Sequence, residues 1–153
     1  MLPNKFILQF TILSTLLMVG CGSGSYTRSD ADLAKISGGE LKEVVPVAGK
    51  ITVDGSPVAG VNVYFHSKVN EPPSTVARTD AAGKYCVSTY RPCDGIVPGE
   101  YLLTFKFMPK MTPNGRGEDL LKGRYADPQN TEFKLTAELR KPQKDVDFEL
   151  NTK

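Results

Sequence analysis

Apolar and polar side chains alternate from Val44 to the end of the chain, with breaks at glycine, aspartate and proline. A period of two places successive side chains on opposite faces and is typical of half-buried strands. We therefore predict an all-β domain over 44–151, a seven-stranded Greek-key sandwich. The inward side chains of the seven strands are Val47, Gly49, Ile51 and Val53; Val61, Val63 and Phe65; Ala77 and Thr79; Tyr85, Val87 and Thr89; Tyr101, Leu103 and Phe105; Phe133, Leu135 and Ala137; Val146, Phe148 and Leu150.

The connections between these strands carry residues that turns require. Asp54-Gly55 follows the first strand and accepts positive φ. We expect a hairpin between the last two strands, turning at 141–143. The connection 108–126 is long for a compact domain, and such loops are often functional or mobile. Within it, 118–122 is predicted as a helical turn that places Leu120 or Leu121 on the sandwich edge.

The first twenty residues form an apolar leader ahead of a cysteine. Lys5 supplies one positive charge, and a mostly apolar stretch follows over Phe6–Val19. This stretch is shorter than the ~20 apolar residues that cross a bilayer, so we predict a removable signal peptide over 1–20. The tetrapeptide Met18-Val19-Gly20-Cys21 resembles a bacterial lipobox, with Met18 where lipoboxes usually have Leu.

The lipobox resemblance implies that Cys21 receives diacylglycerol on its sulfur, becomes the new N-terminus and is acylated on its amine. One acyl chain binds a membrane only marginally, and each further buried CH₂ adds about 0.8 kcal/mol, so several chains form a stable anchor. Gly22 follows the cysteine, which resembles sorting to the outer membrane. We expect an extracytoplasmic protein anchored to a bacterial membrane by palmitate or a similar chain. The alternative is an ordinary leader cut near Gly20.

Residues 21–43 are predicted as a lipidated, flexible tether. They are rich in Gly, Ser, Asp and Lys and poor in apolar side chains, and such a composition does not repay the entropy cost of ordering. A coil of this length spans about 25 Å. The piece Asp30–Ile36 can form one helical turn, but it is too short to persist alone.

The formal net charge of the chain is +2, and its lysines and arginines are scattered. Binding to nucleic acid requires several cations that neutralise neighbouring phosphates. The sequence has no basic run and no aromatic residues interleaved with one. We therefore predict a solvated surface of mixed charge and no nucleic-acid partner.

Several runs of the domain resemble a known family. They read VAGKITVDGSPVAGVNVYF over 47–65, ARTDAAGKYCVST over 77–89, DGIVPGEY over 94–101 and RYADPQNTEFKLTAEL over 124–139. Together they resemble a carboxypeptidase regulatory-like domain of the kind found in bacterial lipoproteins. The resemblance implies a transthyretin-like (prealbumin-like) sandwich, placement outside the cytoplasm and no enzyme activity of its own. Relatives often accompany peptidases or serve as surface modules.

Cys86 and Cys93 remain after Cys21 is assigned, and a pair outside the cytoplasm can oxidise. A bridge requires Cα atoms within about 7 Å. A strand running on to Tyr90 carries the chain about 13 Å beyond Cys86, and the residues up to Cys93 recover about 10 Å. The spacing leaves a disulfide and two free thiols open, and slightly favours the thiols.

His66 is the one histidine of the chain and therefore the candidate general base among histidines. By alternation it points outward with Asn62 and Tyr64, so we expect an exposed structural side chain. Hydroxyisourate hydrolases share the transthyretin-like fold but use several histidines, an arginine and a C-terminal Tyr-Arg-Gly-Ser, whereas this chain ends in Glu-Leu-Asn-Thr-Lys. The spacing matches no zinc pattern. We predict no enzyme activity, no metal and no cofactor.

Tyr64, Tyr90 and Tyr125 are candidate residues for a surface-binding platform, because tyrosine offers flat apolar area and a hydroxyl group. The alternative is ordinary cross-strand pairing and edge cover, with Tyr125 as a plug under the long loop. The sequence thus predicts a non-catalytic, lipid-anchored envelope module that binds protein or glycan. The other hypotheses are a structural component that assembles through its edge strands, and a hydrolase on this fold.

Overall fold

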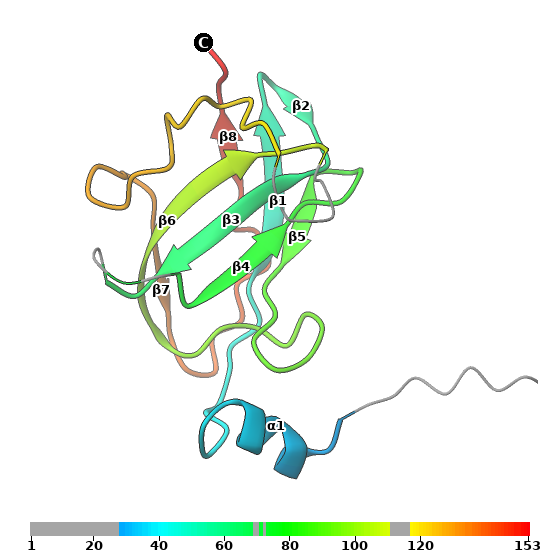
Figure 1. Cartoon of the computed structure of the whole chain (residues 1–153), viewed down its shortest axis with the longest axis vertical. Coiled ribbons are helices and arrows are strands. Elements are labelled where there is room, and N and C mark those ends of the chain that lie inside the picture. Colours follow the sequence, from blue (N-terminus) through cyan, green and yellow to red (C-terminus); the bar gives the residue numbers. More distant parts are fainter. Residues whose placement is uncertain (1–27, 69–70, 72, 111–116) are drawn as a thin grey trace, which may run out of the picture.

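The computed structural model describes residues 28–68, 71, 73–110 and 117–153. Within these ranges the chain forms one short helix and eight strands in two sheets (Figure 1). The fold is therefore mostly β, as the alternation predicts, while the leader and Cys21 lie outside the described residues. The elements are α1 (Asp30–Ile36), β1 (Ala48–Val53), β2 (Ser56–Pro57), β3 (Val61–His66), β4 (Thr75–Arg78), β5 (Lys84–Cys86), β6 (Gly99–Phe107), β7 (Lys134–Ala137) and β8 (Phe148–Leu150).

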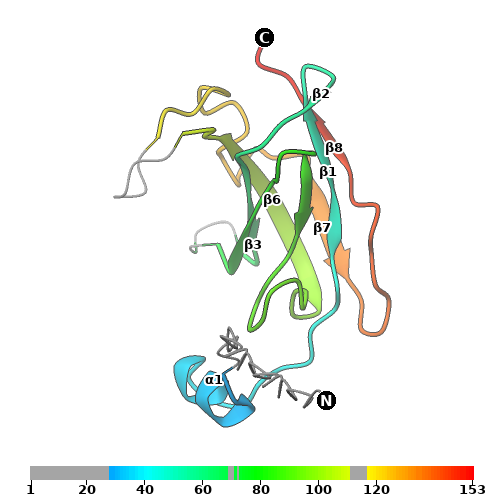
Figure 2. The ribbon, with the colours of Figure 1, turned by 90° about the vertical axis from the view of Figure 1, so that its right-hand side faces the viewer.

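The two sheets pack face to face around a shared core. Figure 2 shows β1 and β8 in one layer and β3 and β6 in the other. The first sheet has the order β2-β1-β5, and β8 pairs with β1 in parallel. The second sheet is antiparallel, with the order β4-β3-β6-β7. One face of each sheet is thus buried, and its other face is available to loops, solvent or ligands.

Most of the predicted inward positions form the core of the domain. Phe105 on β6 has its ring centroid 5.1 Å from that of Phe133 and 5.1 Å from that of Phe148, both in edge-on geometry. Such pairs add to the free energy that burial of the rings supplies. The other core side chains include Ile51, Val53, Val61, Val63, Phe65, Ala77, Tyr85, Val87, Tyr101, Leu103, Leu135, Ala137 and Leu150.

The number of strands differs from the prediction, since the described residues form eight strands and not seven. The additional strand, β2, follows the Asp54-Gly55 turn and returns along β1, where Thr52 faces Pro57. Asp54 has a φ of 49° and Gly55 a φ of 78°, the left-handed conformation expected at this turn. β2 has only two residues, too few to show as alternation in the sequence.

The prediction of a hairpin between the last two strands is wrong. β7 belongs to the second sheet, whereas β8 lies parallel to β1 in the first. The segment between them crosses from one layer to the other, and the Val146 N–H donates to the Ala48 carbonyl at 3.1 Å. Alternation identifies the buried side chains but not their sheet, because both sheets bury side chains in one core.

A side-chain hydrogen bond lies at each edge of the second sheet. At the β7 edge, the side-chain amide of Gln143 donates to the Thr136 carbonyl at 2.7 Å. At the β4 edge, the Thr75 hydroxyl donates to the Ser88 carbonyl, which follows β5, at 2.9 Å. Edge strands offer unpaired backbone groups to other chains. The Gln143 contact occupies one such group of β7, and the Thr75 contact links β4 to the segment after β5.

One carboxylate organises the described part of the long connection after β6. Asp119 accepts hydrogen bonds from the N–H groups of Phe107, Leu121 and Gly123 at 2.9, 3.0 and 3.0 Å. The region predicted as a helical turn is a series of non-helical turns. It still buries Leu121, whereas Leu120 is 37% exposed. The carboxylate replaces the hydrogen bonds that a helix would have supplied.

The segment predicted as a flexible tether contains α1. The Ser29 hydroxyl oxygen caps this helix by accepting from the Asp32 N–H at 3.2 Å, and Leu33 is buried. A seven-residue helix is marginal alone, so its cap, its buried leucine and the contacts with the domain described below account for it. Within the described ranges, no helix is both long and apolar enough to cross a membrane.

Candidate functional site

Tyr64 lies on the outer face of the second sheet. Its side chain is half-buried, and Lys106 Nζ lies 5.8 Å from its ring centroid. Partial burial raises the pKa of the Tyr64 phenol, and a hydrogen bond from Asn62 acts in the opposite direction. Part of the ring is therefore already covered by a cation of the neighbouring strand.

Tyr90 and Tyr125 have other surroundings. The Tyr90 hydroxyl accepts from the Lys42 N–H at 3.1 Å, ahead of β1. Tyr125 packs edge-on against the rings of Phe105 and Phe133, and its hydroxyl accepts from the Asn151 N–H at 3.1 Å. Among the described residues no contact joins two of these tyrosines, so the structure does not bring the predicted platform together. Tyr125 instead closes the core beneath the long connection.

The expectation that His66 is exposed is wrong. His66 is 8% exposed, and its Nε2 lies 3.0 Å from the hydroxyl oxygen of Thr104, which is 3% exposed. The Glu71 carbonyl oxygen lies 3.5 Å from His66 Nδ1. Asn62, also expected outward, is buried. These side chains do lie on the outer face, but neighbouring side chains and the connection after β3 cover that face.

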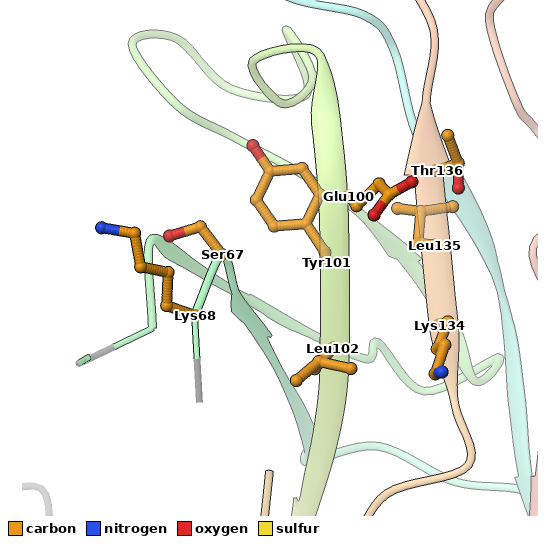
Figure 3. Close-up of a pocket in the computed structure, with 8 residues that line it drawn as sticks. All are labelled: Ser67, Lys68, Glu100, Tyr101, Leu102, Lys134, Leu135 and Thr136. Atoms are coloured by element: carbon orange, nitrogen blue, oxygen red, sulfur yellow. The ribbon is translucent and has the colours of Figure 1, made fainter. Parts of the chain in front are cut away.

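A hollow of about 470 Å³ opens beside β6 and β7 (Figure 3). The Tyr101 ring turns toward Ser67, and the Tyr101 hydroxyl donates to the Val97 carbonyl at 2.7 Å. Tyr101 and Leu135 are themselves buried, so they contribute little apolar surface. Apolar atoms still form about half of the accessible wall, and charged and hydroxyl groups form the rest. The lining residues are Ser67, Lys68, Glu100, Tyr101, Leu102, Lys134, Leu135 and Thr136.

A second hollow, of about 270 Å³, shares Ser67 and Tyr101 with the first. It adds the hydroxyl groups of Ser74, Thr75 and Thr89. Sequence reasoning misses both hollows because their walls come from strands and loops far apart in the chain. The pattern of the sequence carries no local motif for them.

Cys86 and Cys93 form a disulfide, with Cα atoms 5.2 Å apart. The slight preference for free thiols assumed a strand that runs to Tyr90, but β5 ends at Cys86. The chain then reverses, because Asp94 carboxylate oxygens accept from the N–H groups of residues 89, 90 and 91 at 2.7, 2.9 and 2.8 Å. Thr89, predicted to point inward, is consequently exposed.

Tyr85 is a buried titratable residue that a hydrogen bond ties to the segment before β8. Tyr85 is 4% exposed and donates its hydroxyl hydrogen to the Val146 carbonyl at 2.7 Å. Burial raises the pKa of this phenol well above its usual value, and the nearby Asp147 charge adds to the effect. Across the described ranges, no three His, Cys, Asp or Glu side chains gather in a way that could hold a metal ion.

The candidate site therefore consists of two neighbouring hollows, which share Ser67 and Tyr101, with charged groups on the rim. No family model matches the chain, and neither the curated proteins nor the solved structures include a match.

Proposed function

We propose that this protein is a non-catalytic module of a bacterial cell envelope, held outside the cytoplasm by lipid on Cys21, at the outer membrane. The observation that carries this proposal is the disulfide between Cys86 and Cys93. Disulfides persist in oxidising compartments and are rare in the cytoplasm. A bridged pair therefore agrees with a leader that directs the chain out of the cytoplasm.

The arrangement of the domain suits attachment through its N-terminal side. α1 lies at one end of the two sheets, and the residues after β8 lie at the other end (Figure 1). A chain anchored at Cys21 would present this second end away from the membrane. The β1–β2 turn and the described part of the connection after β6 lie there, whereas the hollow includes Glu100 and Tyr101 at the start of β6, toward α1.

We also propose a specific fold for the sandwich. Two facing sheets with a mostly antiparallel pairing support a transthyretin-like, carboxypeptidase regulatory-like domain. In that family the domain is a surface module outside the cytoplasm. Such a domain would have no enzyme activity of its own, which agrees with a role as a surface module.

The hollow beside β6 and β7 is the surface that we propose for a ligand. Glu100 and Lys134 are exposed on its rim, and hydroxyl groups line its walls. Such a wall suits a protein or glycan, whose own surface carries hydroxyl and charged groups, better than it suits an apolar cofactor.

Intact-mass measurement of the native protein tests the placement. We expect a chain that begins at Cys21, carries diacylglycerol and an N-linked acyl chain, and lacks two hydrogen atoms for the Cys86–Cys93 bond. The Cys21→Ser variant should keep its leader and gain no lipid. Recovery of a full-length native chain with an unmodified Cys21 would contradict the proposal.

Glycan arrays and binding to purified envelope proteins test the ligand. Lys134→Glu reverses one charge on the rim, and we expect it to weaken binding about tenfold, or about 1.4 kcal/mol. Lys144→Glu is the matched control, because Lys144 is exposed in the connection between β7 and β8, outside the hollow. Equal losses in both variants would contradict the assignment of the hollow.

A further inference from the structure

The loop after β5 contacts the segment that precedes the domain. We call residues 87–95 the clasp loop and residues 30–42 the docked segment. The Tyr90 hydroxyl accepts from the Lys42 N–H at 3.1 Å, and Arg91 forms an ion pair with Asp30 of α1. Figures 1 and 2 both show α1 beside this loop. The clasp loop thus fixes the docked segment at both of its ends.

The clasp loop is held in shape by hydrogen bonds and by the disulfide. Asp94 binds three N–H groups within the loop, and the Gly95 N–H donates to the Val87 carbonyl at 3.0 Å. Cys93 has a φ of 56°, a left-handed backbone conformation that residues other than glycine rarely adopt. The bond to Cys86 adds a covalent link to these hydrogen bonds, on the same turn that carries Tyr90 and Arg91.

The disulfide is accessible to a reductant. Cys93 is exposed, and Cys86 is partly buried. The thiolate of an external dithiol can attack the Cys93 sulfur, which breaks the S–S bond and releases Cys86 as a thiolate. The second thiol of the reductant then closes its own disulfide and frees Cys93. The protein gains two electrons and two protons, and the dithiol loses them.

We propose that the Cys86–Cys93 disulfide is a redox-controlled clasp, which holds residues 30–42 against the domain when oxidised and releases them when reduced. The Val45 N–H donates to the Ile96 carbonyl at 2.8 Å, and the Ile96 N–H donates to the Val45 carbonyl at 2.9 Å. The chain from Val45 onward therefore stays attached to the domain after reduction. From Cys21, Asp30 is nine residues away and Val45 is 24 residues away.

The clasp would therefore set how far the domain can stand from its anchor. A chain extends by at most about 3.3–3.6 Å per residue, so the longest reach from Cys21 rises from about 30 Å to about 80 Å. This consequence rests on the proposed lipid at Cys21. The docking of residues 30–42 and its release by reduction do not.

Hydrogen–deuterium exchange of the purified chain, with and without dithiothreitol, tests the clasp. We expect amide exchange over 30–42 to be at least fivefold faster after reduction, because a detached seven-residue helix does not persist. Peptides from β3 and β6 should stay protected over the same minutes. The Cys86→Ser/Cys93→Ser variant should exchange like the reduced chain and should not respond to dithiothreitol.

Two variants separate docking from the disulfide itself. Asp30→Asn and Tyr90→Phe each remove one docking contact and leave the bridge intact, so both should speed exchange over 30–42 in the oxidised chain. Glu138→Gln is the control, because it removes an exposed ion pair with Lys141 elsewhere and should change nothing there.

Exchange over 30–42 that is equal in both redox states overturns the clasp. So does a rise that occurs only together with β3 and β6, because it would report a general loss of stability. The mass of the native chain decides separately whether Cys21 carries lipid, so failure of the proposed function and failure of the clasp are distinguishable.

Discussion

Thr104 is an outer-face residue of β6 that solvent scarcely reaches. Its hydroxyl group and the His66 ring satisfy each other's hydrogen bonding at 3.0 Å. A buried polar group without a partner costs much more than the net gain of one hydrogen bond. At the residue scale, this hydrogen bond therefore links β3 and β6 on the outer face of the second sheet. The alternation of side chains in the sequence gives no sign of it.

Thr104→Val should expose the cost of leaving His66 Nε2 unpaired. Valine keeps the shape of threonine but removes the hydroxyl group, so we expect the free energy of unfolding to fall by about 1–3 kcal/mol. Urea unfolding measures the change. Thr136→Val on β7 is the control, because Thr136 is exposed and its substitution should cost under about 0.5 kcal/mol. Equal losses at both positions would contradict this role of Thr104.

Asp54 should release the C-terminal residues in acid. Its carboxylate accepts from the Thr152 hydroxyl at 2.6 Å and from the Thr152 N–H at 3.0 Å, and these bonds lower the pKa of Asp54 below its usual value. A lowered pKa in the folded state means that this stabilisation is complete above the usual aspartate pKa and is lost as pH falls through the lowered one.

The exchange rate of the Thr152 amide, followed by NMR as pH falls, measures this release after correction for intrinsic exchange. Protection should disappear as Asp54 becomes protonated. In Asp54→Asn the protection should be weak and show no titration in this range. A wild-type amide whose protection ignores acid would contradict the assignment.

The segment between β7 and β8 passes close to β1 and limits which side chain β1 can carry at position 49. At Gly49, a Cβ atom would lie 2.0 Å from the Val146 carbonyl oxygen, far inside any van der Waals contact. Backbone and not a movable side chain occupies the space. At the element scale, glycine is therefore required for the last segment to lie along β1.

Gly49→Ala should destabilise the domain by about 1–3 kcal/mol, the usual cost of an inserted group that displaces its neighbours. Thermal unfolding measures the loss as a lower Tm. Gly99→Ala is the matched control at the start of β6, because its Cβ would meet only the Tyr101 ring at an ordinary 3.6 Å. A Gly49→Ala protein as stable as the control would show that the crossing segment can shift.

Much of the element pattern is predictable because alternation is local. Val61, Val63 and Phe65 are buried as expected, since the pleat of one strand decides which side chains share a face. The sheet to which β8 belongs is not predictable in this way. Its register pairs Thr52 with Glu149, two residues that lie near opposite ends of the domain sequence. The alternation within each strand is the same whichever sheet the strand joins.

The site is less predictable than the fold. The distance between Cys86 and Cys93 depends on where β5 ends, and that depends on the Asp94 carboxylate, which closes a turn over three N–H groups. The hollow takes Ser67, Tyr101 and Thr136 from three separate parts of the chain. Neither the bridge nor the hollow can be predicted from the spacing of residues along the chain. The candidate lipid site at Cys21, in contrast, is proposed from four consecutive residues.

At the scale of the whole molecule, the aromatic cluster around Phe105 joins the two layers. Phe105 and Phe133 come from the side of the second sheet, and Phe148 comes from the first. Phe105→Ala should lower the free energy of unfolding by about 3–5 kcal/mol, because it leaves a cavity between the sheets. Denaturant unfolding followed by circular dichroism measures the loss.

Val76→Ala is the control for this core substitution, since Val76 is 45% exposed on β4. We expect it to change the free energy of unfolding by less than about 0.5 kcal/mol. If Phe105→Ala costs no more than Val76→Ala, the two layers do not depend on this cluster.

The contact made by Gln143 at the β7 edge bears on how copies of this domain behave at high local concentration. If the lipid proposed at Cys21 confines these molecules to a bilayer, they would meet repeatedly in similar orientations, which favours strand addition at an uncovered sheet edge. Here an amide from the same chain already occupies the Thr136 carbonyl. Strand addition at the β7 edge would therefore first require Gln143 to leave the Thr136 carbonyl.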